Sequence, residues 1–106
     1  MSQALERLDD LIDRLRHGIT QDQWERVAEL TAAVQPTIEP VMAALAQGDI
    51  EAGLVQERLT ELQALCDQAQ RGAEGHRAEV LAALKGLSRT RAAARSYEDV
   101  SARRNR

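Results

Sequence analysis

The stretch from Thr20 to Leu45 constrains the fold more than any other part of the chain. One set of positions in it recurs in steps of three and four residues: Trp24, Val27, Thr31, Val34, Ile38, Val41 and Leu45. This spacing places all seven side chains on one face of an α-helix. The sequence therefore predicts a helix over about 21–46 that packs through this face, and we expect the other helices to pack against it.

Two signals indicate where this helix begins. Thr20 and Gln23 have the T-x-x-Q spacing of a capping box, in which two side chains satisfy the free backbone donors of a first turn. Ile19 and Trp24 stand where a hydrophobic staple would close over that turn. We therefore expect Thr20 to be the N-cap of the helix, and Trp24 to be a core anchor rather than an exposed binding residue.

Two prolines, Pro36 and Pro40, lie inside the same stretch. In a helix interior each proline removes a backbone donor and clashes with the carbonyl four residues back, at a cost of roughly 3 kcal/mol. The apolar face nevertheless keeps its phase across both prolines. We therefore expect a single helix with a kink near 32–36 rather than two helices separated by a loop.

Amphipathic segments flank this helix on both sides. Residues 3–17 carry Leu8, Leu11 and Leu15 on one face, and Gly18 is the expected stop of this first helix. After Gly48 and Asp49, which we expect to end one helix and cap the next, the apolar steps continue to Leu87. This pattern predicts a third helix over about 50–95. Gly72 and Gly75 are its weak point, so a separate fourth helix over 76–95 is the alternative.

The composition agrees with helices throughout. The chain of 106 residues has no Phe, one Trp and one Tyr, whereas strong helix formers are abundant. We expect an all-α fold: an antiparallel three-helix bundle, with a four-helix bundle as the alternative, and a long C-terminal helix. Residues 1–97 form a single domain in this prediction, and 98–106 form a basic disordered tail.

Charge is distributed unevenly along the chain. Residues 1–84 hold 7 Arg and 15 Asp or Glu, a balance of −8, whereas residues 85–106 hold 7 Lys or Arg and 2 acids, a balance of +5. Three interpretations of the basic end remain open: a solvated terminus, a contact with an acidic protein surface, or a nucleic-acid arm. We favour the first, and nucleic-acid binding is the weakest of the three.

The expected helix lengths differ. At 1.5 Å per residue, a helix over 50–95 is about 68 Å long, whereas its antiparallel partner over 21–46 is about 40 Å long. Beyond about residue 76 nothing in the chain would cover the apolar face that carries Val80, Leu84 and Leu87. An uncovered face of this kind indicates a partner, a second copy or a fold-back at Gly72 to Gly75.

No pattern of reactive residues indicates an enzyme, a metal site or a cofactor site. His17 and His76 lie on different helices and lack partners at the spacing of a metal site or a catalytic triad. The single cysteine, Cys66, excludes an intrachain disulfide and fits a reducing compartment, and we expect it to be a small buried apolar residue. No apolar run approaches the roughly 20 residues of a membrane span. We expect a cytoplasmic protein that does not contact a membrane.

Three stretches carry a resemblance to a known family. They are the runs DQWERVAEL at 22–30, HRAEVLAALKGL at 76–87 and ARSYED at 94–99. Together with a short first helix that ends near His17, they are similar to the flagellar export chaperones of the FliT type. The similarity lies in order, length and pattern over most of the chain.

The resemblance implies a small cytoplasmic all-helical chaperone of flagellar type III secretion. Such a protein binds the C-terminal segment of an exported subunit, here the filament-capping protein, prevents premature assembly and delivers the subunit to the export apparatus and its ATPase. Some members also bind a transcriptional regulator of flagellar genes. Carried over to this chain, the client surface comprises Arg77, Val80, Leu84, Leu87 and Tyr97.

This chain departs from the family pattern at its end. Members often finish with a further helix that covers the client surface, whereas here the residues after Tyr97 are few and rich in Arg. Any cover would have to be the segment 76–95 itself, folded back. The alternative function is a self-associating coiled-coil structural or adaptor protein, in which a second copy, as a homodimer, fills the same face.

Overall fold

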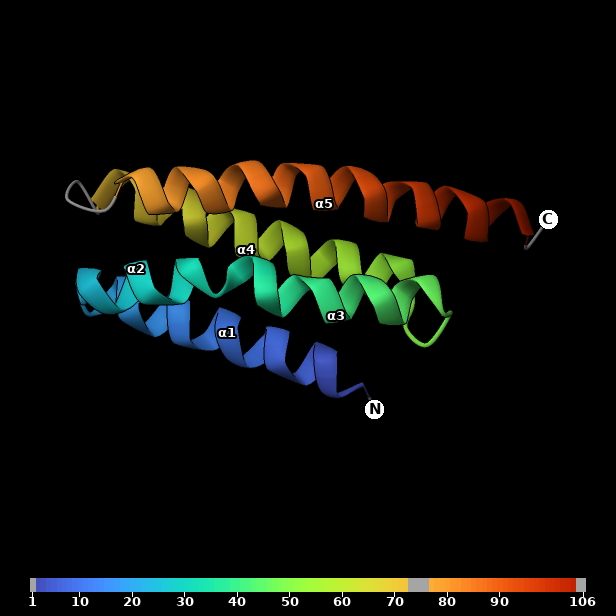
Figure 1. Ribbon diagram of the computed structural model, residues 1–106, viewed down its shortest axis with the longest axis horizontal. Coiled ribbons are helices and arrows are strands. Elements are labelled where there is room, and N and C mark those ends of the chain that lie inside the picture. Colours follow the sequence, from blue (N-terminus) through green and yellow to red (C-terminus); the bar gives the residue numbers. More distant parts are fainter. Residues whose placement is uncertain (1, 73–76, 105–106) are drawn as a thin grey trace.

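The computed structural model describes residues 2–72 and 77–104, with side chains for 2–72 and 78–100 (Figure 1). Five helical segments follow one another along the chain: α1 (Gln3–Thr20), α2 (Trp24–Ala32), α3 (Val34–Ala46), α4 (Ala52–Gly72) and α5 (Arg77–Arg104). The described residues contain no strand. The prediction of an all-α helical bundle is confirmed.

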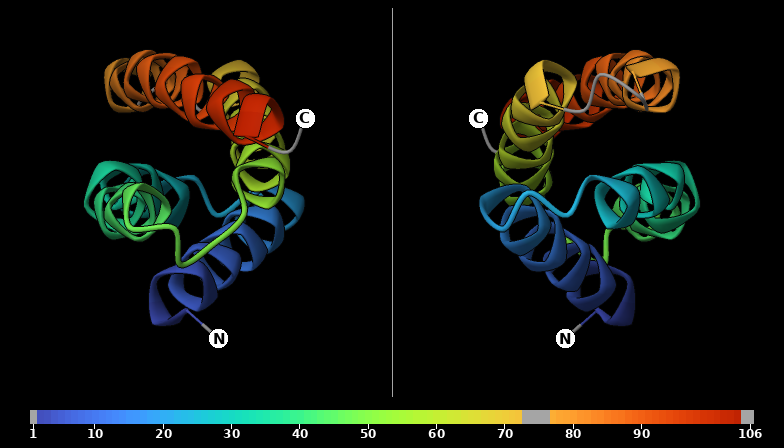
Figure 2. Two further views of the ribbon diagram at one scale, coloured as in Figure 1. Left: turned by 90° about the vertical axis from the view of Figure 1, so that its right-hand side faces the viewer. Right: turned by 90° about the vertical axis from the view of Figure 1, so that its left-hand side faces the viewer.

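The helices form two antiparallel hairpins that pack against each other. In one hairpin α1 lies against α2 and α3, and in the other α4 lies against α5. The hairpins meet with α1 beside α4, and with α2 and α3 beside α5 (Figure 2). Because α2 and α3 together span the length of one bundle position, the molecule is a four-helix bundle of 48 × 24 × 19 Å.

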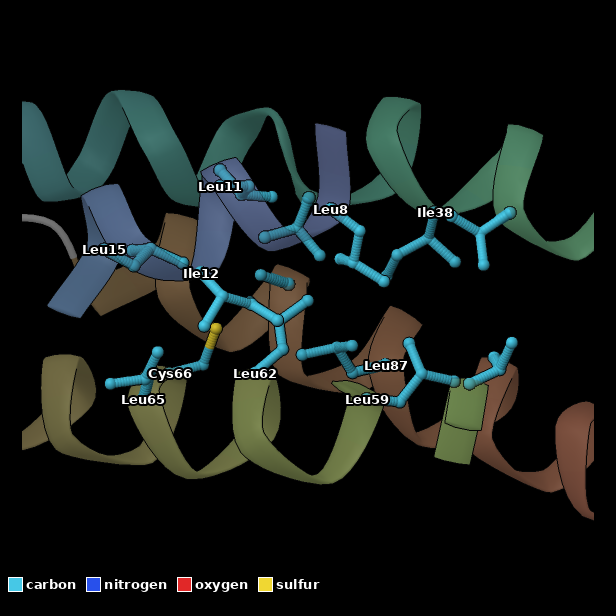
Figure 3. Close-up of a cluster of buried hydrophobic side chains, with 14 of the residues drawn as sticks. Leu8, Leu11, Ile12, Leu15, Ile38, Leu59, Leu62, Leu65, Cys66 and Leu87 are labelled. Carbon is cyan, nitrogen blue, oxygen red and sulfur yellow. The ribbon is translucent and has the colours of Figure 1, made fainter. Parts of the chain in front are cut away.

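A continuous apolar core runs along the bundle (Figure 3). Leu8 and Leu15 of α1, Leu59 and Leu62 of α4, and Leu87 of α5 are fully buried. Complete burial of a side chain of this size contributes about 1.5–3 kcal/mol relative to leaving it in water. The core therefore holds both hairpins together, because every bundle position supplies residues to it.

The expected kink lies at Ala33. The chain leaves α2 there and re-enters a helix at Val34, so Pro36 falls in the first turn of α3, where a missing backbone donor costs little, and only Pro40 is interior. The Thr37 backbone N–H and hydroxyl both donate to the Ala33 carbonyl, at 3.1 and 2.7 Å. The apolar face keeps its phase through the kink, as predicted, with these residues buried: Val27, Thr31, Val34, Ile38, Val41 and Leu45.

The predicted boundary between the first two helices is wrong. Helix α1 does not stop at Gly18 but continues to Thr20, whose hydroxyl donates to the Arg16 carbonyl at 2.8 Å instead of capping the next helix. Helix α2 begins at Trp24, and its N-cap, Gln23, makes no side-chain capping bond. Gly18 is buried, and a Cβ there would stand 3.1 Å from Cγ2 of Val27. The glycine thus serves a close approach of α1 and α2 rather than a helix end.

In the turn after α3, the expected role of Gly48 is confirmed and that of Asp49 is wrong. Gly48 has φ +80° and ends the helix as predicted. Its N–H donates to the Leu45 carbonyl at 3.1 Å, and the Asp49 N–H donates to the Ala44 carbonyl at 2.9 Å, which together form a Schellman motif. Asp49 therefore closes α3 and does not cap α4, which begins at Ala52.

The single long helix expected over 50–95 is two antiparallel helices, α4 and α5. The fold-back occurs between Gly72 and Arg77, and the expectations for Gly75 and His76 lie outside the described residues. The prediction of a disordered tail from residue 98 is also wrong as far as Arg104, because α5 continues to that residue. Residues 105–106 lie outside the described part of the chain.

Candidate protein-binding surface

The residues predicted to bind a partner differ in how far they are exposed. Val80 and Leu87 are fully buried, Leu84 is half-buried against the core, and Tyr97 is 39 % exposed. The side chain of Arg77 lies outside the described residues. The expected uncovered face over 80–87 does not exist, because α5 folds back along α4 and turns these side chains into the core.

An uncovered stretch does occur, but further along α5. Ala94 is buried, and residues 95–100, the last whose side chains the structure describes, are all exposed. Figure 1 shows that this part of α5 extends past the neighbouring ends of α3 and α4. We call residues 97–104 the projecting end of α5. The projecting end exists because α5 continues seven residues past Tyr97, to Arg104.

Two apolar side chains mark the projecting end. Tyr97 is 39 % exposed and Val100 is 47 % exposed, and their spacing of three places them on neighbouring positions of one helix side. Exposed Arg95, Glu98 and Asp99 surround them with both signs of charge. Apolar anchors within a charged border suit contact with a helix of another protein. Sequence reasoning missed Val100 because it placed that residue in a disordered tail.

Ion pairs connect α1 with α4. Arg58 of α4 contacts Asp9 of α1 at 2.7 Å, and Arg16 of α1 contacts Glu61 of α4. These side chains are partly exposed, so each pair contributes no more than about 1 kcal/mol. Helix α5 is tied to α4 by a different contact, in which Nη1 of Arg91 donates to Oε1 of Gln63 at 2.5 Å. The polar contacts therefore hold α1, α4 and the middle of α5, and none of those that the structure describes reaches the projecting end.

The one cysteine lies in the core. Cys66 is fully buried beside the leucines of α1 and α4 (Figure 3). Burial, assisted by the nearby charge of Asp67, raises the pKa of its thiol from 9.0 to about 12. The prediction of a small buried apolar residue is confirmed, and the neutral thiol is a poor nucleophile at physiological pH.

Trp24 packs against the core and covers Gly72, the last residue of α4. A Cβ at Gly72 would overlap the indole ring, whereas a Cβ at Gly53, near the start of the same helix, would meet no atom within 4 Å. We therefore expect Gly72→Ala to lower the free energy of unfolding by about 1–3 kcal/mol through overpacking. It should also change the fluorescence emission of this sole tryptophan.

The matched control for this prediction is Gly53→Ala. It should leave the emission unchanged and raise the free energy of unfolding by about 0.5–1 kcal/mol, because alanine favours the helix more than glycine does. Urea titration followed by fluorescence and circular dichroism measures both variants. Equal effects of the two substitutions would show that the indole does not pack on Gly72.

Within residues 2–72 and 77–104, no helix has both the length and the apolar character of a membrane span. No cluster of three or more His, Cys, Asp or Glu side chains in that part of the chain is placed to hold a metal ion. No protein-family model, curated protein or solved structure matches the chain. We take the projecting end of α5 as the candidate site because it exposes Tyr97 and Val100.

Proposed function

We propose that this protein is an export chaperone of the FliT type. In this proposal it binds the C-terminal segment of an exported flagellar subunit, the filament-capping protein, in the cytoplasm and keeps it from assembling before export. Delivery to the export ATPase, and binding of a flagellar regulator, belong to the same proposal. It rests first on the sequence resemblance, of which residues 24–30 lie in α2 and residues 77–87 and 94–99 lie in α5.

The observation that carries the proposal is the exposure of Tyr97 and Val100 on the projecting end. Tyr97 belongs to the run ARSYED, one of the three stretches that carry the resemblance. A partly exposed tyrosine offers a large apolar ring and a hydroxyl that needs a hydrogen-bond partner. Tyrosine is among the residues that most often dominate the binding energy of protein interfaces.

In this proposal the buried residues of the predicted surface stabilise the bundle and do not contact the client. Val80 and Leu87 hold α5 against the bundle, because removing them from the core would expose two fully buried side chains. The client therefore makes its contact at Tyr97 and Val100, where no core residue has to be uncovered. In this proposal the chain needs no further helix as a cover, because α5 itself packs over the apolar face.

The proposal predicts that Tyr97→Ala weakens client binding by about tenfold or more, because truncation of an interface anchor removes most of its apolar contact. The measurement is a calorimetric titration of the full chain with the C-terminal segment of the capping protein at low salt. Light-scattering mass should show a one-to-one complex.

The control variant is Leu81→Ala, which truncates an exposed apolar side chain elsewhere on α5. It should leave the affinity unchanged. Folded wild-type protein that fails to bind the segment at low salt would refute the proposed function. Equal losses for the two variants would refute the assignment of the contact to the projecting end.

A further inference from the structure

The basic end of the chain is an ordered surface in this structure. Residues 80–97 hold four bases and no acid, and all of them belong to helix α5. This helix runs along one edge of the bundle, so one of its sides faces away from the other helices (Figure 2). On that side Leu81, Lys85 and Arg89 are exposed and follow one another in steps of four residues. We call these three residues the outer row of α5.

Lys85 and Arg89 differ from the other exposed bases because no acid lies one turn away from them on the helix. Among residues 2–72 and 78–100, every other exposed Arg has an Asp or Glu three or four positions away, as Arg14 has Asp10. The positions three and four residues from Lys85 and Arg89 hold Leu, Ala, Gly, Ser or the other base. Two like charges one turn apart disfavour a helix. The helix itself therefore does not compensate this pair of charges.

The neighbouring helices do not pair with these two bases either. Helix α3 packs beside α5, and its only charged residue is Glu39. The ion pairs among the described residues all lie on α1 and α4, and none includes Glu39, Lys85 or Arg89. Within the described part of the chain, the outer row thus presents two positive charges without an ion pair, next to one exposed leucine.

An acidic α-helix is the partner that fits this row. Two carboxylates would relieve the repulsion between the bases, and an apolar side chain one turn away would cover Leu81. A helix satisfies its own backbone hydrogen bonds, so it needs only the side-chain contacts that the outside of α5 offers. A step of four residues advances about 6 Å along either helix, so the contacts stay in register over all three positions.

A nucleic-acid duplex fits the row less well. It carries one negative charge per about 1.7 Å of its axis, and it would bring that charge over exposed Glu39 and Glu79 as well as over the two bases. Its phosphates also offer no apolar contact to Leu81. The small exposed neighbours Ala82 and Ala92 instead allow a helix to approach to the usual interaxial distance of about 8–10 Å.

We propose that the outer row of α5 docks an acidic amphipathic helix of another protein. This helix carries one apolar residue and two carboxylates in successive steps of four residues on the same side. The contact is weak and transient, because one side of a single helix supplies less than the roughly 800 Å² per partner of a standard interface. It is separate from the proposed client contact, because the row includes neither Tyr97 nor Val100.

The test titrates the full chain at low salt with two synthetic peptides and follows its backbone amides by NMR. Each peptide is alanine-based and about 20 residues long, which is sufficient for a helix in water. The first carries one leucine and two glutamates at the proposed spacing, and the second carries glutamines in place of the glutamates. The glutamate peptide should shift the amides around residues 81–89 and lose affinity as salt rises. The glutamine peptide should bind at least about fivefold more weakly.

Arg89→Glu should weaken binding of the glutamate peptide by about fivefold or more, because it replaces an attraction by a repulsion. The double variant carrying Lys85→Glu and Arg89→Glu should instead prefer a third peptide, in which lysines replace the glutamates. Arg26→Glu, the same charge change at an exposed base on α2, is the control and should leave the affinity within about twofold of the wild type. Circular dichroism checks that every variant is folded.

Three results with the peptides would each overturn the proposal: no binding at low salt, equal affinity for the glutamate and glutamine peptides, or equal losses in Arg89→Glu and Arg26→Glu. A double-stranded oligonucleotide that binds more tightly than the glutamate peptide, and loses affinity in Arg89→Glu, would also overturn it and identify a nucleic-acid surface. Failure of the capping-protein segment to bind would refute the proposed function but would leave this test unaffected.

Discussion

Leu87→Ala is expected to lower the free energy of unfolding by about 2–5 kcal/mol. The side chain is fully buried between α5 and the rest of the bundle, in the same apolar core as Leu59 and Ile38 (Figure 3). Truncation removes the apolar contacts of the leucine and leaves a cavity that the surrounding helices only partly close. Urea unfolding followed by circular dichroism measures the change.

Leu81→Ala is the matched control for this prediction. It makes the same chemical change six residues earlier on the same helix, at a side chain that is 43 % exposed. We expect a change within about 0.5 kcal/mol, as for most surface substitutions. The pair of variants tests whether α5 packs against the bundle, as in the structure, or is unattached. If α5 were unattached from residue 77 onward, both substitutions would have the same small effect.

Alkaline pH is expected to destabilise the fold through Cys66. The folded protein keeps the thiol protonated up to a pKa of about 12, whereas the unfolded chain releases the proton near pH 9. Between these values the folded state binds more protons than the unfolded state, so stability falls as pH rises. The slope that one such group contributes is about 1.4 kcal/mol per pH unit.

The measurement is the free energy of unfolding at several pH values between 8 and about 11. Lysine and tyrosine also titrate in this range, so the comparison is with Cys66→Ala, which removes only the thiol. The difference in free energy between the two proteins should change with pH by the slope given above. A difference that stays constant would mean that solvent reaches the thiol in the folded protein.

Much of the fold could be predicted because the helical period persists across its interruptions. Val34, Ile38 and Val41 keep one face through two prolines, and the structure buries all three. A phase that continues through Pro36 requires helix on both sides of it, so the kink near 32–36 followed directly. The apolar steps from Val55 to Leu87 also identified most of the buried residues of α4 and α5, although they missed Leu65 and Ala94.

The candidate site could not be placed because the same period has two spatial solutions. Steps of three and four residues from Leu62 to Leu87 fit one long helix, and they fit equally well two helices that both face one core. The choice decides whether Val80 is exposed or buried. Local signals were ambiguous in the same way, since Thr20 has the residue type of an N-cap but bonds back to its own helix. The fold-back of α5 and the role of Thr20 both depend on tertiary packing, which local sequence patterns do not predict.

The hairpin arrangement has a consequence for the speed of folding. Each hairpin joins helices that are neighbours in the chain, so α1 can meet α2 and α3, and α4 can meet α5, after closing only a short loop. Helical proteins dominated by such local contacts fold within microseconds to milliseconds. Contacts between the two hairpins join residues further apart in the chain, so we expect their formation to be the slower event. Its rate should depend on the residues that join α1 to α4, and α3 to α5, more than on the turns.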